Sequence, residues 1–223
     1  MKTDSPSDRL VKKVKFYQSS PVGYSIEDIG KIPITTELVK DIFECLRSSD
    51  VSELKSGLWF AQGVLDSNPP KELLCFLVAE LPKWMTSQDD NVRWRALSLL
   101  IRLRENFPNY RSLMIKCLQD VDPEVRIDAL AAYSTFLTDK DIPILLEFQR
   151  DDYMSETSMN SPLVYLIRNQ ALEIIEQLCG QKFPKHENVK LLEIGQSVYW
   201  WDWKPFLDWW DSRQSKWRLW GAR

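Results

Sequence analysis

The sequence predicts an all-α fold, a right-handed α-solenoid of about four helix pairs that ends in a C-terminal capping helix. The pattern Val-Arg-x-x-Ala-Leu occurs at Val92 and again 33 residues later at Val125, and a repeat period of about 20–50 residues is typical of stacked helical arrays. Apolar residues follow Val92 at helical spacing, which predicts an amphipathic helix. Glycine supplies only 7 of the 223 residues, which disfavours folds built on tight glycine turns.

Residues 1–34 are predicted to form a partly disordered N-terminal arm. Residues 1–8 are polar, and the basic stretch from Arg9 to Tyr17 alternates only loosely between apolar and polar side chains. Chain termini are usually poorly ordered unless another element holds them. A frayed terminus is therefore the expectation, and an arm that binds a partner is the alternative.

Residues 35–180 hold the predicted repeats, each a pair of helices. The first helices are predicted at residues 37–46, 71–84, 111–118 and 142–148, and the second helices begin near Leu54, Val92, Val125 and Ile167. A short polar break separates the two helices of a pair. Asp50, Asp89 and Asp122 stand in these breaks as predicted N-caps, because a carboxylate accepts hydrogen bonds from the unpaired amides of a first turn.

The segment from Leu118 to Leu130, LQDVDPEVRIDAL, resembles the turn and second helix of the HEAT-repeat family, with its signature L-x-D-x-D-P-x-V-R-x-x-A-L. The resemblance covers about residues 35–180 and implies a fold rather than a function, because HEAT arrays serve many purposes. It also implies a ladder of ion pairs between arginines and turn aspartates of the repeats. The arginines would be Arg93, Arg126 and Arg168, and the aspartates Asp89 and Asp122.

An acidic stretch at residues 151–162 lengthens the fourth repeat beyond the usual connection between paired helices. A solvated insertion is the expected reading. The alternative is a partner-binding loop, or a cation site formed by Asp151, Asp152 and Glu156. The spacing of these acids lacks the glycine turn of calcium-binding loops, which argues against calcium.

Residues 181–223 are predicted to form a tryptophan-rich cap. The segment resembles the tail that follows some bacterial HEAT arrays. A helix is expected to begin at Asp202 or Lys204, and Trp203, Phe206 and Trp210 would share one of its faces. A terminal repeat needs such a cover because its core face is otherwise open. An exposed aromatic platform is the alternative, with Trp209, Trp217 and Trp220 off the buried face.

Composition excludes several kinds of site. The single histidine, His186, lies in a polar run and is expected in a loop, so sites that need two imidazoles are excluded. The four cysteines form no CxxC pair and have apolar neighbours, which predicts buried thiols in a reducing compartment. No secretory signal or long apolar run is present, so a cytoplasmic protein with no membrane contact is expected. No metal and no cofactor are expected.

No motif for catalysis was found, and the protein is predicted not to be an enzyme. The sequence contains no GxSxG, Walker loop or GxGxxG, and one histidine leaves no room for most triads. The net charge is −3, whereas proteins that bind nucleic acid are usually basic. Nucleic acid is therefore disfavoured as a partner.

The expected function is a non-catalytic protein–protein interaction module, a monomeric scaffold or adaptor that binds another protein on its solenoid surface. The predicted partner-binding residues are Trp94, Arg95, Arg102, Asp128, Gln170 and Trp209. The first two are the predicted centre, because tryptophan and arginine are enriched at interface hot spots. For Trp94 the alternative is packing against a neighbouring repeat. Positions off the core stripe, including Ile127 and Asn169, are also expected to face outward.

Two other functions are alternatives to this expectation. One is an inhibitor or immunity-type protein that blocks a basic toxin or nuclease. The other is a nucleic-acid binder or a HEAT-like DNA-alkylation-repair glycosylase, a family that places a tryptophan and an aspartate one helical turn apart. None of Trp59, Trp84 and Trp94 has that aspartate, but a basic strip surrounds Trp94. The strip consists of Arg93, Arg95, Arg102 and Arg104.

Overall fold

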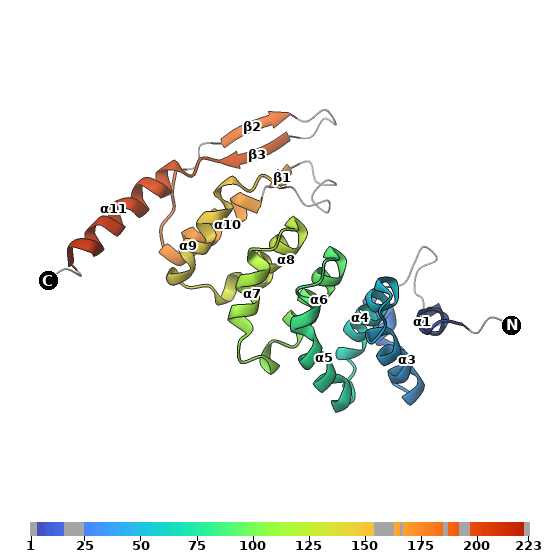
Figure 1. The fold of residues 1–223 in the computed structure, drawn as a ribbon. Coiled ribbons are helices and arrows are strands. Elements are labelled where there is room, and N and C mark those ends of the chain that lie inside the picture. The colour runs from blue at the N-terminus through green and yellow to red at the C-terminus, as the bar shows by residue number, and fades with distance from the viewer. Residues whose placement is uncertain are drawn as a thin grey trace. The chain divides into compact units, whose positions relative to one another are not determined.

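The computed structural model describes residues 4–15, 25–153, 163–165, 167–184, 187–191 and 197–220. These residues are mostly helical, as the sequence predicts (Figure 1). The chain divides into two compact units, Met1–Val125 and Arg126–Arg223. His186, predicted to lie in a loop, and Glu156, predicted to belong to a cation site, are outside the described residues. The side chains of Trp217 and Trp220 are outside them as well.

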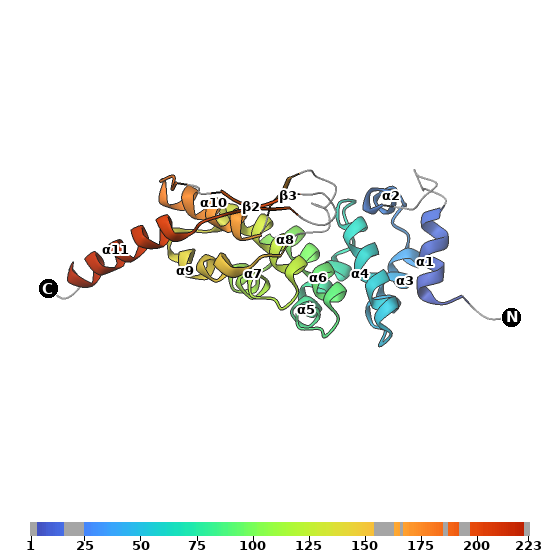
Figure 2. The ribbon, with the colours of Figure 1, turned by 90° about the horizontal axis from the view of Figure 1, so that it is seen from above.

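The first unit consists of helices. They are α1 (Pro6–Lys15), α2 (Ile26–Gly30), α3 (Thr36–Leu46), α4 (Val51–Leu65), α5 (Lys71–Trp84), α6 (Asp90–Arg102) and α7 (Tyr110–Leu118), with a 3-10 turn at Arg104–Asn106. Helix α4 packs against both α3 and α6 (Figure 2). The predicted helix pairs in this part of the chain are therefore present as α3 with α4 and α5 with α6.

The predicted N-caps start their helices. The Asp50 carboxylate accepts a hydrogen bond from the Glu53 amide at 3.0 Å. The Asp89 carboxylate accepts one from the Val92 amide at 2.9 Å. Asp122 does the same for Val125 at 3.1 Å, so each carboxylate satisfies an amide that has no partner within its own helix.

Two glycines let α4 approach its neighbours closely. A Cβ atom on Gly63 would lie 2.4 Å from the Ile29 side chain of α2, and one on Gly57 would lie 2.8 Å from the Cβ of Cys45 in α3. Any larger residue at either position would push these helices apart. The sequence pattern alone gives no sign of this constraint.

In the N-terminal arm the structure describes residues 4–15 and 25–34, which include helices α1 and α2. Helices α1 and α2 bury Leu10, Val14 and Ile29, and Ile32, which follows α2, is buried as well. The Asp41 carboxylate of α3 accepts hydrogen bonds from Arg9 at 2.9 Å and from Lys13 at 2.6 Å. Burial would raise the pKa of Asp41, but the hydrogen bonds from these two cations outweigh it and lower the pKa. The loose alternation of the sequence conceals one helical stripe of α1, in which Leu10 and Val14 are buried.

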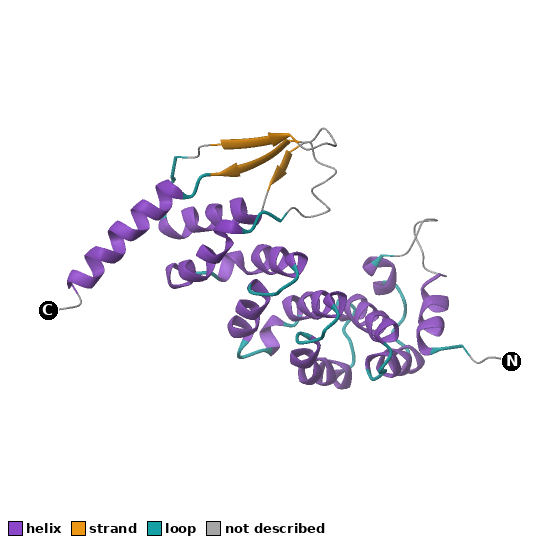
Figure 3. Ribbon diagram, turned by 45° about the horizontal axis from the view of Figure 1, so that its top comes forward, coloured by secondary structure: helices purple, strands orange, loops and turns teal. Residues whose placement is uncertain are grey.

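The second unit combines helices with a small sheet (Figure 3). Its helices are α8 (Pro123–Tyr133, which spans the division), α9 (Ile142–Leu145), α10 (Ile167–Cys179) and α11 (Lys204–Trp220), with 3-10 turns at Ser134–Phe136, Asp139–Asp141 and Leu146–Arg150. Its strands are β1 (Leu163–Tyr165), β2 (Glu187–Leu191) and β3 (Ser197–Trp201). The helix predicted at residues 142–148 is thus a short α9 followed by a 3-10 turn.

The sequence analysis did not predict the sheet. Its strand order is β1-β3-β2. Strand β3 runs parallel to β1, with Leu163 opposite Ser197, and antiparallel to β2, with Glu187 opposite Trp201. The Asn169 side chain of α10 accepts a hydrogen bond from the Trp201 amide at 3.0 Å. Asn169 is therefore buried and fixes the end of β3, in contrast to the outward position that helical spacing alone suggests.

Helix α11 begins at Lys204, one of the two predicted starts, and the Asp202 carboxylate accepts a hydrogen bond from the Lys204 amide at 2.9 Å. Trp203 and Phe206 are buried as predicted, while Trp210 is half-buried. The Phe206 ring is the centre of an aromatic cluster. Its neighbours are Phe183 at 5.3 Å and Trp203, Trp209 and Trp210 at 6.1 Å between ring centroids.

The cysteines do not all follow the prediction of buried thiols. Cys45 and Cys117 are buried, and burial raises the pKa of each to about 12. Cys179 is half-buried, and Cys75 is exposed on α5. The prediction is therefore wrong for Cys75, because its apolar neighbours in sequence lie on other sides of the same helix.

Candidate functional site

Ion pairs connect successive helix pairs, as the resemblance to HEAT repeats implies, but the partners differ. The Arg93 guanidinium donates two hydrogen bonds of 2.9 Å to the Asp120 carboxylate. Asp89 instead accepts a hydrogen bond from Lys55 at 3.1 Å. Asp122 caps its own helix. Arg93 has a structural role, because its pair with Asp120 is nine-tenths buried.

Two arginine–aspartate pairs in the second unit remove the predicted cation site. Arg126 donates to Asp151 at 2.8 Å, and Arg168 donates to Asp152 at 2.8 Å. The carboxylates of Asp151 and Asp152, which would have to bind the cation, are thus already paired with guanidinium groups. We therefore discard the cation site at Asp151, Asp152 and Glu156, the last of which lies outside the described residues.

A cluster of two tryptophans and one arginine lies where α4 meets α6. We call Trp59, Trp94 and Arg95 the α4–α6 cluster. The Arg95 guanidinium carbon lies 5.6 Å from the ring centroid of Trp59 and 5.7 Å from that of Trp94. All three side chains are half-buried. The buried Gln62 amide donates a hydrogen bond to the Arg95 carbonyl at 3.1 Å and joins the two helices at this point.

Arg95 differs electrostatically from the other arginines of α6. Its burial lowers the pKa of its guanidinium. Its Nε is buried and makes no hydrogen bond, and in the part of the chain that the structure describes no carboxylate pairs with Arg95. The indole faces supply a cation–π attraction, but no carboxylate among the described residues balances this partly desolvated positive charge.

Arg102, also predicted to bind the partner, is already paired. Its guanidinium donates to both oxygens of Asp66, the C-cap residue of α4, at 2.7 and 2.6 Å. With Arg93 bound to Asp120, two of the four arginines in the predicted basic strip have their charge matched by an acid. This weakens the argument for a nucleic-acid surface, which needs cations free to meet phosphates.

The remaining predicted residues belong to the second unit. Asp128 on α8 and Gln170 on α10 are half-buried, and Ile127, expected to face outward, is buried. Trp209 on α11 is half-buried and packs its ring 5.3 Å from that of Phe183. Of the predicted residues in the first unit, Trp94 and Arg95 lie together in the α4–α6 cluster, whereas Arg102 on the same helix is paired with Asp66.

Sequence reasoning missed Trp59 and Gln62. The ion pairs between helix pairs could have indicated both residues, because Lys55 and Arg93 hold equivalent positions in successive second helices. Aligning the two helices on this pair would have placed α4 beside α6 and Trp59, one turn beyond Lys55, near Arg95.

No protein-family model matches the sequence, and no curated protein sequence is significantly similar to it. Within the described ranges, no helix combines the length and apolar character needed to cross a bilayer. Over the same residues, no group of three or more His, Cys, Asp and Glu side chains could hold a metal ion.

Proposed function

We propose that this protein is a non-catalytic protein-binding module, and that the α4–α6 cluster contacts an acidic side chain of its partner. The observation that supports this most is the partly desolvated Arg95 cation, placed between two half-buried indoles without a carboxylate partner among the described residues.

The chemistry of the cluster favours a carboxylate. Folding has already removed much of the water from Arg95, so a partner's Asp or Glu would restore its counter-ion at a small further desolvation cost. A guanidinium can bond both oxygens of a carboxylate, and such charge-assisted pairs are stronger than neutral hydrogen bonds. The flanking indoles of Trp59 and Trp94 would exclude water from the contact, as the surroundings of interface hot spots do.

We further infer that the helix pairs form a right-handed HEAT-like solenoid of about four repeats, closed by the aromatic cluster around Phe206. The recurrence of the ladder supports this inference. Lys55 with Asp89, Arg93 with Asp120 and Arg126 with Asp151 each join a second helix to the turn of the next pair. A compact globule of 223 residues would have a radius of gyration of about 17 Å. Small-angle scattering should give a larger value, and a value near that of the globule would contradict the solenoid.

The inhibitor alternative receives less support from the surface around α6. An inhibitor of a basic toxin needs free carboxylates, whereas Asp66 and Asp89 are bound to Arg102 and Lys55. The unmatched charge at the cluster is positive, which favours an acidic partner instead.

The test is affinity capture from a lysate of the native host, with nuclease added to one half of each sample. Arg95→Glu would repel an acidic partner, so a protein retained by the wild type should be lost. The matched control is Arg47→Glu, because Arg47 also lies over two aromatic rings, Phe43 at 5.0 Å and Phe76 at 5.2 Å, but is exposed on the layer of first helices.

Retention of the same protein by both charge-reversal variants would contradict the proposed site. Loss of all captured material on nuclease treatment would contradict the proposed function and return attention to nucleic acid. Thermal melting of each variant distinguishes a lost contact from a lost fold.

A further inference from the structure

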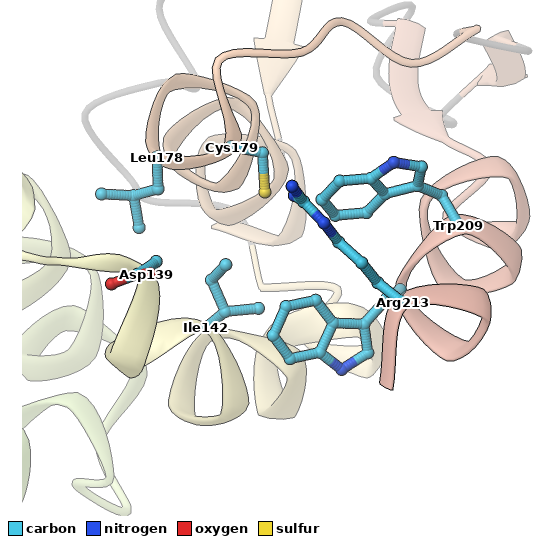
Figure 4. A pocket seen from close by; sticks show the side chains of 7 residues that line it. Asp139, Ile142, Leu178, Cys179, Trp209 and Arg213 are labelled. Carbon is cyan, nitrogen blue, oxygen red and sulfur yellow. The ribbon is translucent and has the colours of Figure 1, made fainter. Parts of the chain in front are cut away.

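A pocket of about 460 Å³ lies within the second unit (Figure 4). Its walls come from the 3-10 turn at Asp139–Asp141 and from α9, α10 and α11. The lining residues are Asp139, Ile142, Leu178, Cys179, Trp209, Trp210 and Arg213. Pockets that bind small molecules usually enclose about 300–1,000 Å³, so this space is large enough for a small ligand.

One wall of the pocket is aromatic and firmly supported. The Trp209 and Trp210 rings lie 6.4 Å apart at an angle of 36°, and both are half-buried. Behind them the buried Phe206 contacts both rings. Ile142 and Leu178 add aliphatic surface. Such walls favour a flat apolar group, because aromatic rings gain from stacked and edge contacts as well as from burial.

The charged side chain of Arg213 lies against this aromatic wall. The Arg213 guanidinium carbon lies 4.8 Å from the Trp209 ring centroid. Arg213 makes no hydrogen bond or ion pair with any residue that the structure describes. The Asp139 carboxylate is on the far side of the pocket from Trp209, with Cys179 between them (Figure 4). A carboxylate attached to a ring could thus reach Arg213 while the ring contacts the indoles, whereas a group directed to Asp139 would have to leave them.

We propose that this pocket binds a small aromatic carboxylate, with its carboxylate on Arg213 and its ring against Trp209 and Trp210. The site lies wholly within the second unit and is independent of the α4–α6 cluster. Its specificity would come from the guanidinium, which discriminates the acid from its neutral amide, while the apolar walls accept either.

Cys179 lines the pocket and provides a direct readout of occupancy. A bound ligand should slow alkylation of this thiol by N-ethylmaleimide, measured by peptide mass spectrometry. The exposed Cys75 of the first unit is an internal control, and its rate should not change. We expect indole-3-acetate to protect Cys179 in a saturable way, and indole-3-acetamide to bind about tenfold more weakly, because one charge-assisted hydrogen bond is lost.

Two variants separate the roles of the charges. Arg213→Gln should weaken protection by indole-3-acetate about tenfold, whereas Arg150→Gln, at an exposed arginine of the same unit, should not. Asp139→Asn should strengthen it a few-fold by removing a like charge near the ligand. Each variant is compared with itself without ligand, because Arg213 and Asp139 also act on the pKa of Cys179.

Several results would overturn the proposal. One is equal protection of Cys179 by indole-3-acetate and indole-3-acetamide, and another is stronger protection by tryptamine than by indole-3-acetate. A third is unchanged protection in an Arg213→Gln protein that melts like the wild type. The last is no protection by indole-3-acetate at millimolar concentration.

Discussion

Each unit of the molecule holds an arginine stacked on tryptophan, and the two pairs differ in what surrounds them. Arg95 lies between two indoles where regular helices α4 and α6 pack together, and its Nε is buried. Arg213 is exposed and covers one indole at the edge of a pocket. The first arginine has lost solvation during folding, and the second has not. We therefore expect the same residue pair to cost stability at Arg95 and to leave it nearly unchanged at Arg213.

The largest expected effect concerns the cluster that supports the pocket. Phe206→Ala removes a fully buried ring contacted by several aromatic side chains, and should lower the free energy of unfolding by about 4 kcal/mol. Urea denaturation measures this loss. Phe136→Ala, in the same unit but 41% exposed, is the control and should cost far less. Equal losses would show that the aromatic cluster is not the core of the second unit.

The arginine–aspartate pairs should contribute unequally to stability, according to their burial. Arg93→Ala leaves Asp120 in a site where both side chains are only 10% exposed, and should cost about 3 kcal/mol. Arg168→Ala should cost less than about 1 kcal/mol, because its partner Asp152 is 70% exposed. Both losses are read from urea denaturation midpoints. A larger loss of stability for Arg168→Ala than for Arg93→Ala would contradict the idea that burial decides how much each ion pair contributes.

Arg95 and Arg213 should separate stability from binding. A pKa lowered in the folded state means that the charged form is disfavoured there, so charged Arg95 costs stability at every pH below its folded pKa. Arg95→Met keeps the packing on the indoles and removes the charge. It should leave the free energy of unfolding unchanged or raise it by about 1 kcal/mol, while abolishing partner capture.

Arg213→Gln, by contrast, should change the stability by less than about 0.5 kcal/mol. Strong destabilisation by Arg95→Met in urea denaturation would mean that another group stabilises the charge of Arg95 in the folded protein.

The smallest effects concern thiol reactivity. At a pH near 8, Cys75 should react with N-ethylmaleimide first and Cys179 more slowly, because burial raises the pKa of Cys179 and leaves less thiolate. Cys45 and Cys117, whose pKa values are raised to about 12, should react only after unfolding. Raising the pH should accelerate Cys179 markedly. Alkylation of Cys117 in the folded protein would contradict its burial.

Sequence reasoning was most successful where the information was local. The caps at Asp50, Asp89 and Asp122 and the start of α11 at Lys204 depend on residues three or fewer positions apart. The site was only partly predictable. Trp94 and Arg95 were identified, but Trp59, which completes their cluster, lies 35 positions earlier on another helix.

The amino-acid sequence by itself determined the helical character and the helix starts, because these follow from spacing along one chain. A ladder of basic and acidic residues was expected only from the resemblance to HEAT repeats. The tertiary structure decided which acid each arginine meets, that β3 pairs with β1 and β2, and that Asn169 is buried. It also decided that Arg95 is left without a counter-ion among the described residues while Arg102 is paired. These outcomes depend on burial and on the approach of residues distant in sequence, which no local pattern encodes.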